Sequence, residues 1–227
     1  MNSVISPLSR PFPDLPQIAG VTLRTARAAY KDWDRADLTL IELVEGTTVA
    51  GVFTRNVCCS SEVEIGREQA RLGRARAVVI NAGNSNAFTG YRGREAVEAI
   101  MAQVAMHYDC LPSDVFVCST GVIGVPLPQG KAKAGVAAAV QATPCNWEAA
   151  ARAIGTTDTF PKGAGAAAML GGTRVELAGI IKGSGMIAPD MATMLGYIAT
   201  DAAIAPPFLQ ELLSKANAES FSCITVD

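Results

Sequence analysis

The scarcest side chain in this chain of 227 residues is histidine, of which there is one, His107. A single imidazole excludes His-rich zinc centres and di-iron carboxylate bundles, because both need at least two. A serine or cysteine triad would have to use His107 or do without an imidazole. We place His107 at the end of a helix over 95–107, where a cation meets the negative end of the helix dipole. We therefore favour a structural role for it.

Excess charge of one sign is also absent. The chain has 19 Lys and Arg against 21 Asp and Glu, a net charge of -2, and a pI near 5.5. This balance, without a long run of like charge, predicts no nucleic-acid partner and no membrane-surface patch. Hydrophobic residues make up 49% and charged residues 18% of the chain. This composition is typical of a folded protein with a large core.

Metal-binding cysteine motifs and membrane-spanning runs are missing too. None of the six cysteines forms a C-x-x-C pair, so we expect no metal site and interpret them as reduced, buried thiols of a cytoplasmic protein. The most apolar region, 177–209, is interrupted by Lys182, Asp190 and Asp201 and is too short between breaks to cross a bilayer. Prolines in the first seventeen residues argue against a signal peptide.

Strand and helix patterns alternate along the chain. Runs of branched apolar residues predict strands over 38–44, 48–53, 77–80, 115–117, 164–170, 173–181, 194–199 and 221–226. Helical periodicity predicts helices over 62–72, 95–107, 131–141, 147–154 and 207–217, with Asn146 as one N-cap. Turns at 45–47 and 171–172 predict two hairpins, and the asparagine-rich 81–86 predicts a loop or a close backbone approach. The pattern indicates a layered α/β structure with mixed sheets.

Two apparent nucleotide-binding motifs fail on their context. GAGAAA at 163–168 fits a dinucleotide loop, but no clear strand precedes it and no acidic residue follows about twenty positions on. GVPLPQGK at 124–131 resembles a P-loop with one residue too many, and Ala132 replaces the hydroxyl that would hold magnesium. We expect no nucleotide cofactor.

Three segments rich in glycine and hydroxyl side chains are the candidates for chemistry. They are CSTGVIG at 118–124, TTDTFPK at 156–162 and KGSGMIAPDMATML at 182–195. Lys182 follows four residues that look buried, so its ammonium needs a partner or a cleft. Gly183 and Gly185 would allow the backbone to approach a ligand closely.

These segments resemble the ornithine acetyltransferases, the ArgJ family of arginine biosynthesis. KGSGMIAPDMATML is similar to the family signature, and five further blocks match in the same order: VFTRN, NAGNSNAFTG, CSTGVIG, TTDTFPK and ITVD. The resemblance covers essentially all 227 residues. It implies a layered α/β sandwich of the self-processing N-terminal nucleophile type, similar to DmpA. The family chain continues past Asp227, and the strand pattern over 221–226 stops without a turn, so we expect a single catalytic domain that is truncated.

The resemblance also implies the catalytic residues. Family members cut themselves at the position of Ala192 and Thr193, which would give an α chain of 1–192 and a β chain beginning with 193–227. Thr193 would then be the nucleophile, and its new α-amino group, with a reference pKa of about 7.7–8.0, would be the base. Thr120 and Gly121 would form the oxyanion hole. The substrate would contact Lys182, Thr193 and Thr156, although Thr157 is adjacent and could take the place of Thr156.

The implied reaction moves an acetyl group from N-acetylornithine to glutamate through an acetyl ester on Thr193. It needs no metal and no cofactor, although some members also accept acetyl-CoA as a co-substrate, which the sequence leaves open. The family assembly is a heterotetramer of two α and two β chains. Asp190 stands where many members have Asn; its carboxylate would either raise the pKa of the Thr193 amine or point to solvent, and we favour the second. Two alternatives remain: a related N-terminal nucleophile aminopeptidase or amidohydrolase, and an inactive fragment.

Overall fold

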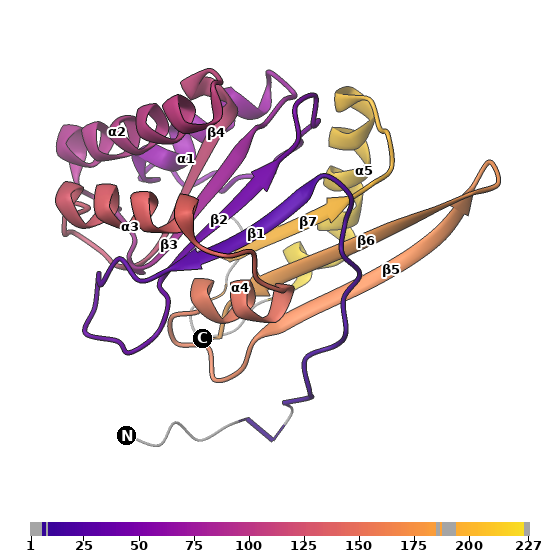
Figure 1. Ribbon diagram of the computed structural model, residues 1–227, viewed down its shortest axis with the longest axis horizontal. Coiled ribbons are helices and arrows are strands. Elements are labelled where there is room, and N and C mark those ends of the chain that lie inside the picture. The colour runs from indigo at the N-terminus through magenta and orange to yellow at the C-terminus, as the bar shows by residue number, and fades with distance from the viewer. Residues whose placement is uncertain (1–5, 8, 185–186, 188–193, 225–227) are drawn as a thin grey trace.

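The computed structural model describes residues 6–7, 9–184, 187 and 194–224. Its first sheet has four strands in the order β1-β2-β3-β4, running from β1 at one edge to β4 at the other (Figure 1). The β1–β2 and β2–β3 pairs are antiparallel and the β3–β4 pair is parallel, so the predicted mixed sheet is confirmed. The strands are β1 (Val21–Ala26), β2 (Leu38–Leu43), β3 (Ala77–Asn84) and β4 (Val115–Val122).

Helices cover one face of this sheet. They are α2 (Gly90–Tyr108) and α3 (Gln129–Gln141), while α1 (Ser61–Ala70) packs against α2 and the edge strand β4. A 3-10 turn (Pro112–Asp114) precedes β4. Alternate residues of a strand point to opposite faces, so one set of strand side chains packs against α2 and α3. The core of this layer includes Leu38, Leu40, Val79, Val97, Ile100, Val117 and Val136.

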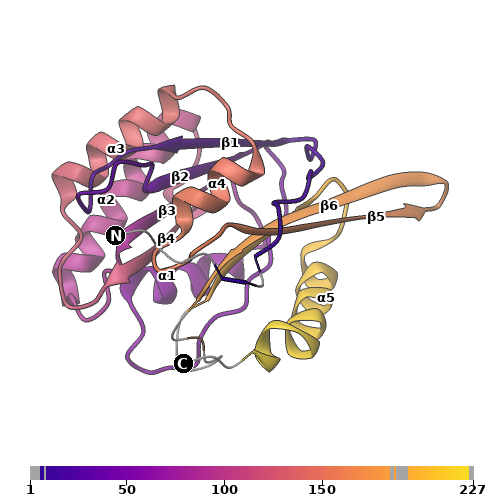
Figure 2. The same cartoon turned by 90° about the horizontal axis from the view of Figure 1, so that it is seen from below.

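The other face of the first sheet packs against a second, antiparallel sheet and a helix between the two. This sheet has the order β5-β6-β7, with β5 (Lys162–Leu170), β6 (Thr173–Lys182) and β7 (Leu195–Thr200). Figure 2 shows α4 (Trp147–Ile154) lying between the sheets. The core of this layer includes Leu23, Ile41, Ile80, Phe116, Trp147, Ile154 and Ile180. Both sheets are thus stacked beneath one helical layer, which confirms the predicted layered α/β sandwich.

The β5–β6 hairpin projects from the body of the molecule, and α5 (Pro206–Glu219) follows β7 at its side (Figures 1 and 2). The predicted turn at Gly171-Gly172 connects β5 and β6, as expected. The predicted N-cap is also confirmed, because Asn146 Oδ1 accepts the Ala149 amide at 2.9 Å. His107 is exposed in the last turn of α2, which agrees with a structural role. No helix in the described part of the chain is long and apolar enough to cross a membrane.

Two predicted strands are wrong. The segment 48–53 forms only an isolated bridge, between Thr48 and Arg74, because both edges of β2 are occupied by β1 and β3. Its chain turns instead towards α5, where the Gly51 amide donates to Gln210 Oε1 at 3.1 Å. The other error is at 221–226: Phe221–Cys223 is a 3-10 turn, closed by hydrogen bonds onto Ser220 and Phe221, and the last residues of that range lie outside the described part.

The expected burial of the cysteines is also wrong. All six are free thiols, but Cys58 and Cys223 are exposed and the other four are only half-buried. Cys58 lies in the turn that leads to α1, and Cys223 lies in the C-terminal 3-10 turn. The two exposed cysteines thus occupy surface turns rather than core positions of a helix or strand.

Candidate functional site

The ends of β6 and β4 meet at the candidate site. Lys182, the last residue of β6, donates from Nζ to Thr120 Oγ1 at 2.8 Å. Both residues are buried, with 7% of Lys182 and 5% of Thr120 exposed. The predicted need of Lys182 for a partner is therefore met by a hydroxyl from the other sheet. Two of the sequence-predicted site residues, 62 positions apart, are in direct contact.

The ammonium of Lys182 is held in an environment that disfavours its charge. Burial lowers the pKa of Lys182, and the negative charge of Asp158 acts in the opposite direction. Within the described residues, no carboxylate forms a direct ion pair with Lys182. A lysine in this position has two further N–H donors available for a ligand once one is used on Thr120.

Gly121 follows Thr120 at a point where the backbones of β3 and β4 approach closely. Its φ of +136° lies in the region that favours glycine, and an added Cβ would stand 2.5 Å from the Asn84 amide nitrogen and overlap the Gly83 carbonyl carbon. The β3–β4 register is irregular between Gly83 and Asn84. The predicted close approach at 81–86 is confirmed, although the strand continues through Asn84 where a loop was one alternative.

Asparagine side chains hold the segment around Thr120 in place. Asn81 Oδ1 accepts from Ser119 Oγ at 2.8 Å, and its Nδ2 donates to the Asn84 carbonyl at 2.8 Å. Asn84 Nδ2 in turn donates to the Val125 carbonyl at 3.0 Å. These bonds fix the chain on both sides of Thr120 to β3. The run of asparagines in the sequence was the signal for this network, but the sequence did not indicate which groups they would bind.

A buried carboxyl stands behind this network. Asn86 Nδ2 donates to Glu62 Oε2 at 3.1 Å, and Asn86 Oδ1 accepts the Leu127 amide at 3.2 Å. Burial raises the pKa of Glu62, and hydrogen bonds, including the one from Asn86, oppose this rise. The second oxygen of Glu62 has no hydrogen-bond partner among the described groups. Glu62 was not predicted as a site residue.

Asp158 brings the third predicted segment to the same place. Its Oδ1 accepts from Lys162 Nζ at 2.6 Å and from the Gly183 amide at 2.8 Å, and its Oδ2 accepts the Thr156 amide at 3.3 Å. Burial alone would raise the pKa of Asp158, but the hydrogen bonds from Lys162 and Gly183 bring it below its ordinary value. The segment 156–162 is thereby joined to the end of β6. Sequence analysis singled out this segment but gave Asp158 no role.

The remaining predicted site residues divide into two groups. Thr156 is half-buried beside Asp158, whereas its neighbour Thr157 is exposed. Ala192 and Thr193, together with Asp190, lie outside the described residues. Among the described residues, no group of three or more His, Cys, Asp or Glu side chains could hold a metal ion.

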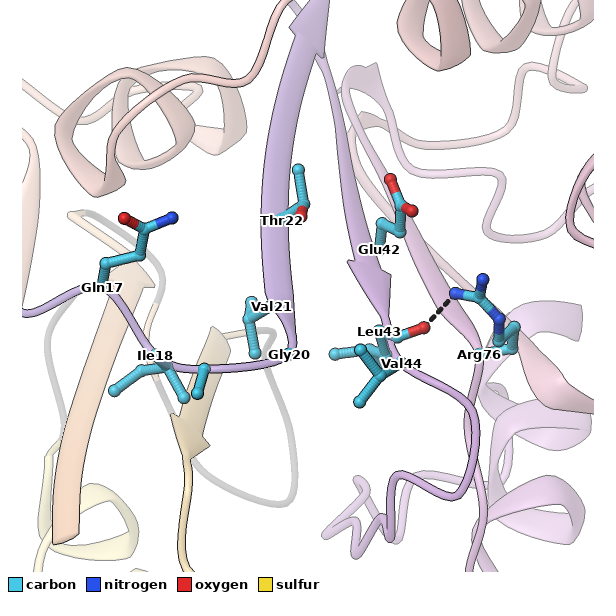
Figure 3. Close-up of a pocket in the computed structure, with 10 residues that line it drawn as sticks. Gln17, Ile18, Gly20, Val21, Thr22, Glu42, Leu43, Val44 and Arg76 are labelled. Carbon is cyan, nitrogen blue, oxygen red and sulfur yellow. Dashed lines mark hydrogen bonds between the residues drawn. The ribbon is translucent and has the colours of Figure 1, made fainter.

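Two hollows of the described surface lie away from this site. One, of about 340 Å³, opens at the opposite end of the first sheet between β1 and β2, where Arg76 donates to the Leu43 carbonyl (Figure 3). A second, of about 380 Å³, lies beside the first turns of α1 and α2 and is lined by Phe88 and Tyr91, among others. Neither contains Thr120 or Lys182. We assign the candidate site from the buried polar contacts because they join the three predicted segments.

The family model for ArgJ matches residues 22–227 of this chain. The chain belongs to the ArgJ family. The arginine biosynthesis bifunctional protein ArgJ of Zymomonas mobilis is 58% identical over 224 residues, which are 98% of this chain and 55% of that protein. The protein of the same name from Gluconobacter oxydans is 50% identical, over 98% of this chain and 53% of its own length. This ArgJ-family chain therefore spans about half the length of the curated relatives it matches.

Solved structures agree with the assignment. The crystal structure of ArgJ from Bacillus halodurans has a TM-score of 0.71 and 30% identity, covering 78% of this chain and 92% of that chain. Ornithine acetyltransferase from Mycobacterium tuberculosis, complexed with ornithine, has a TM-score of 0.64 and 31% identity, covering 78% of this chain and 94% of that chain. The PH0078 protein of Pyrococcus horikoshii, at 12% identity and a TM-score of 0.53, shares the fold alone. The predicted family is confirmed.

Proposed function

We propose that this ArgJ-family chain is the N-terminal part of a glutamate N-acetyltransferase that uses N-acetylornithine as its acetyl donor. The observation that carries the proposal is the buried contact of Lys182 with Thr120, since it joins the two segments to which the family resemblance assigns the oxyanion hole and the substrate. The relative complexed with ornithine supports an amino acid with an α-carboxylate as the ligand.

The nucleophile in this proposal is Thr193, released as a new N-terminus by self-cleavage after Ala192. A threonine hydroxyl needs a base, and the α-amino group of the same residue provides one without an imidazole. The exposure of His107 in the last turn of α2 fits a site that does without histidine. Leu195, two residues after Thr193 in the sequence, pairs with Lys182 across β6 and β7.

The lengths of the related chains support self-cleavage. The match to the solved chain from Bacillus halodurans covers 78% of this chain but 92% of that chain. The same aligned stretch is a larger share of the solved chain, so the solved chain is shorter than 227 residues. The curated relative from Zymomonas mobilis is covered to only 55%. The solved chain is thus much shorter than the curated relative, and a cut in the precursor near 192–193 would produce such a chain.

The reaction then proceeds in two acyl transfers. Thr193 Oγ attacks the acetyl carbonyl of N-acetylornithine, and the hydroxyl proton passes through the α-amine to the leaving nitrogen of ornithine. This leaves an acetyl ester on Thr193 and free ornithine. The amino group of glutamate attacks that ester, loses its proton to the α-amine, and departs as N-acetylglutamate while the Thr193 hydroxyl is restored.

Thr120 and Gly121 stabilise the oxyanion of each tetrahedral intermediate in this scheme. The Thr120 oxygen accepts from Lys182, so its own hydrogen is free to point at the oxyanion. The backbone at Gly121 is fixed by its approach to β3, which is the preorganisation that such a donor needs. Removing one oxyanion donor typically costs about 10²–10³ in rate.

Lys182 and Thr156 complete the substrate contacts. The two remaining donors of the Lys182 ammonium suit the α-carboxylate that both ornithine and glutamate carry. We choose Thr156 rather than Thr157 as the substrate-binding residue. The Thr156 amide donates a hydrogen bond to Asp158 at the site, whereas Thr157 is exposed. We further propose the family assembly of two α and two β chains, and a cytoplasmic location, which the six free thiols fit.

The test is an acceptor-dependence assay on the full-length product of the native gene. Isotopically labelled acetyl from N-acetylornithine should appear in N-acetylglutamate only when glutamate is present, and Thr193→Ala should abolish transfer. Release of labelled acetate at the same rate without glutamate would identify an amidohydrolase instead. Full transferase activity in Thr193→Ala would disprove the nucleophile. Replacing N-acetylornithine by acetyl-CoA in the same assay decides whether the enzyme accepts a second donor.

A further inference from the structure

Asp158 connects two segments of the candidate site that are distant in the sequence. It lies between α4 and β5, and 7% of its side chain is exposed. One carboxylate oxygen accepts from Lys162 Nζ at 2.6 Å and from the Gly183 amide at 2.8 Å. The other accepts the Thr156 amide at 3.3 Å. A single buried carboxylate therefore ties its own turn to the residue that follows β6.

The Gly183 amide is the point at which Asp158 acts on Lys182. This N–H belongs to the peptide bond that joins Lys182 to Gly183, so fixing it fixes the backbone end of the lysine. Gly183 has a φ of +156°, and an added Cβ would stand 2.7 Å from Ile187 Cδ1. The other end of Lys182 is fixed by the bond from Nζ to Thr120 Oγ1 at 2.8 Å. The lysine is thus held at both ends.

The charge of Asp158 acts on the same side chain. Burial lowers the pKa of Lys182, the negative charge of Asp158 raises it, and the positive charge of Lys162 lowers it. Lys162 Nζ forms an ion pair with Asp158 Oδ1 at 2.6 Å. The negative charge of Asp158 also acts to raise the pKa of Arg35. Among the described residues, Asp158 is the negative charge that opposes desolvation of Lys182.

We propose that Asp158 is a positioning residue of the site, which fixes the backbone of Lys182 through Gly183 and brings a negative charge near its ammonium, which is bonded to Thr120. Held in this way, Lys182 occupies a lone pair of the Thr120 oxygen and directs the Thr120 hydrogen towards the oxyanion. This assignment rests on the proposed function, because the oxyanion belongs to that reaction. Asp158 itself need not touch the substrate.

Three variants of the full-length enzyme separate charge from geometry. Asp158→Asn keeps the size and one acceptor oxygen but removes the charge. Asp158→Glu keeps the charge but is one methylene too long to hold both backbone amides as Asp158 does. Asp201→Asn is the matched control, because Asp201 Oδ1 accepts the Glu176 amide at 2.8 Å on the same strand, far along β6 from Lys182.

Two readouts test the proposal. Competitive labelling of amines with isotopic acetic anhydride across a pH series gives the titration midpoint of Lys182 from its peptide mass, independently of activity. The second readout is the dependence of kcat on pH. We expect its basic limb, the high-pH side of the profile where activity falls, to follow the loss of the Lys182 proton. Asp158→Asn should lower both the midpoint and the basic limb. It should also reduce kcat at alkaline pH by about 10²-fold, the typical cost of a small misplacement of a positioned group.

The remaining outcomes are also decisive. Asp201→Asn should match the wild type in both readouts, and Asp158→Glu should keep the Lys182 midpoint while losing several-fold in kcat. A midpoint and a basic limb unchanged in Asp158→Asn would overturn the positioning role. If Asp158→Asn fails to fold, an unchanged kcat in Asp158→Glu overturns it. A wild-type enzyme without acetyl transfer would disprove the proposed function, while the labelling midpoint would still decide the role of Asp158.

Discussion

Lys182 Nζ lies 2.8 Å from Thr120 Oγ1, which joins the last residue of β6 to the end of β4. The two strands belong to different sheets, and both side chains are buried. A lysine placed here costs desolvation free energy, because burial favours its neutral form. Such an arrangement is typical of a functional site, and in this family chain it connects the two segments that the proposed reaction needs.

Replacing Thr120 by Val removes the hydroxyl while keeping the branched shape. We expect kcat to fall by about 10²–10³, the usual effect of losing one oxyanion donor. Thr120→Ser retains the hydroxyl and is the control, which should keep most of the activity. Steady-state kinetics of both variants with N-acetylornithine and glutamate checks this. Equal activity in Thr120→Val and the wild type would remove Thr120 from the oxyanion hole.

Gly121→Ala should destabilise the junction of β3 and β4. The added Cβ would stand 2.5 Å from the Asn84 amide nitrogen, at a φ of +136°. Gly124→Ala is a matched control, since Gly124 has a φ of +81° with nothing within 4 Å of an added Cβ. We expect Gly124→Ala to cost about 1–2 kcal/mol from backbone strain alone, and Gly121→Ala to cost clearly more. Equal losses in urea unfolding would show that the β3 contact is unimportant.

Glu62 should make stability depend on pH. Its pKa is raised in the folded state by burial, so its contribution is fully present below the pKa of the unfolded chain and is lost as the pH rises through the folded value. Glu62→Gln can still accept from Asn86 and removes this dependence. Its free energy of unfolding should therefore decline less than that of the wild type as the pH rises above about 4.3, the usual value for Glu.

The control for this prediction is Glu64→Gln, in the same first turn of α1. Glu64 is exposed and lies 3.8 Å from Arg94 in a surface ion pair, which contributes little to stability. Its variant should retain the pH dependence of the wild type. If Glu62→Gln also retained the pH dependence of stability, the buried Glu62 carboxyl would not be the source of that dependence.

Asn146→Ala should destabilise the helix that lies between the sheets. Asn146 Oδ1 accepts the Ala149 amide at 2.9 Å and caps α4, which carries Trp147 and Ile154 into the core. Loss of an N-cap typically costs about 1 kcal/mol. Asn146→Ser keeps an acceptor and should lose less, which thermal unfolding of the two variants would measure. A melting temperature of Asn146→Ala equal to that of the wild type would show that the cap contributes nothing.

Patterns that depend on local chain geometry were predictable from the sequence. The turn at Gly171-Gly172, the cap at Asn146 and a helix with His107 in its last turn all follow from neighbouring residues, and all three are present. The buried ammonium of Lys182 also required a partner for energetic reasons. The family resemblance predicted Thr120 as a site residue. It did not predict that Thr120 would be the hydrogen-bond partner of Lys182.

Features that depend on competition between distant segments were not predictable. The segment 48–53 has strand-forming residues but finds both edges of β2 occupied, and β1, which takes one of them, was not predicted. The role of Asp158 was missed for a similar reason. Its partner Gly183 is 25 residues away, and only the docking of β6 beside the turn after α4 brings the two together.

The most direct test of the account is the denatured mass of the full-length gene product, before and after incubation with N-acetylornithine alone. We predict two pieces, one ending at Ala192 and one beginning at Thr193, with the second gaining the mass of one acetyl group on its N-terminal residue. Addition of glutamate should remove that group. A single uncut chain that never becomes acetylated would contradict the proposed nucleophile and the reaction built on it.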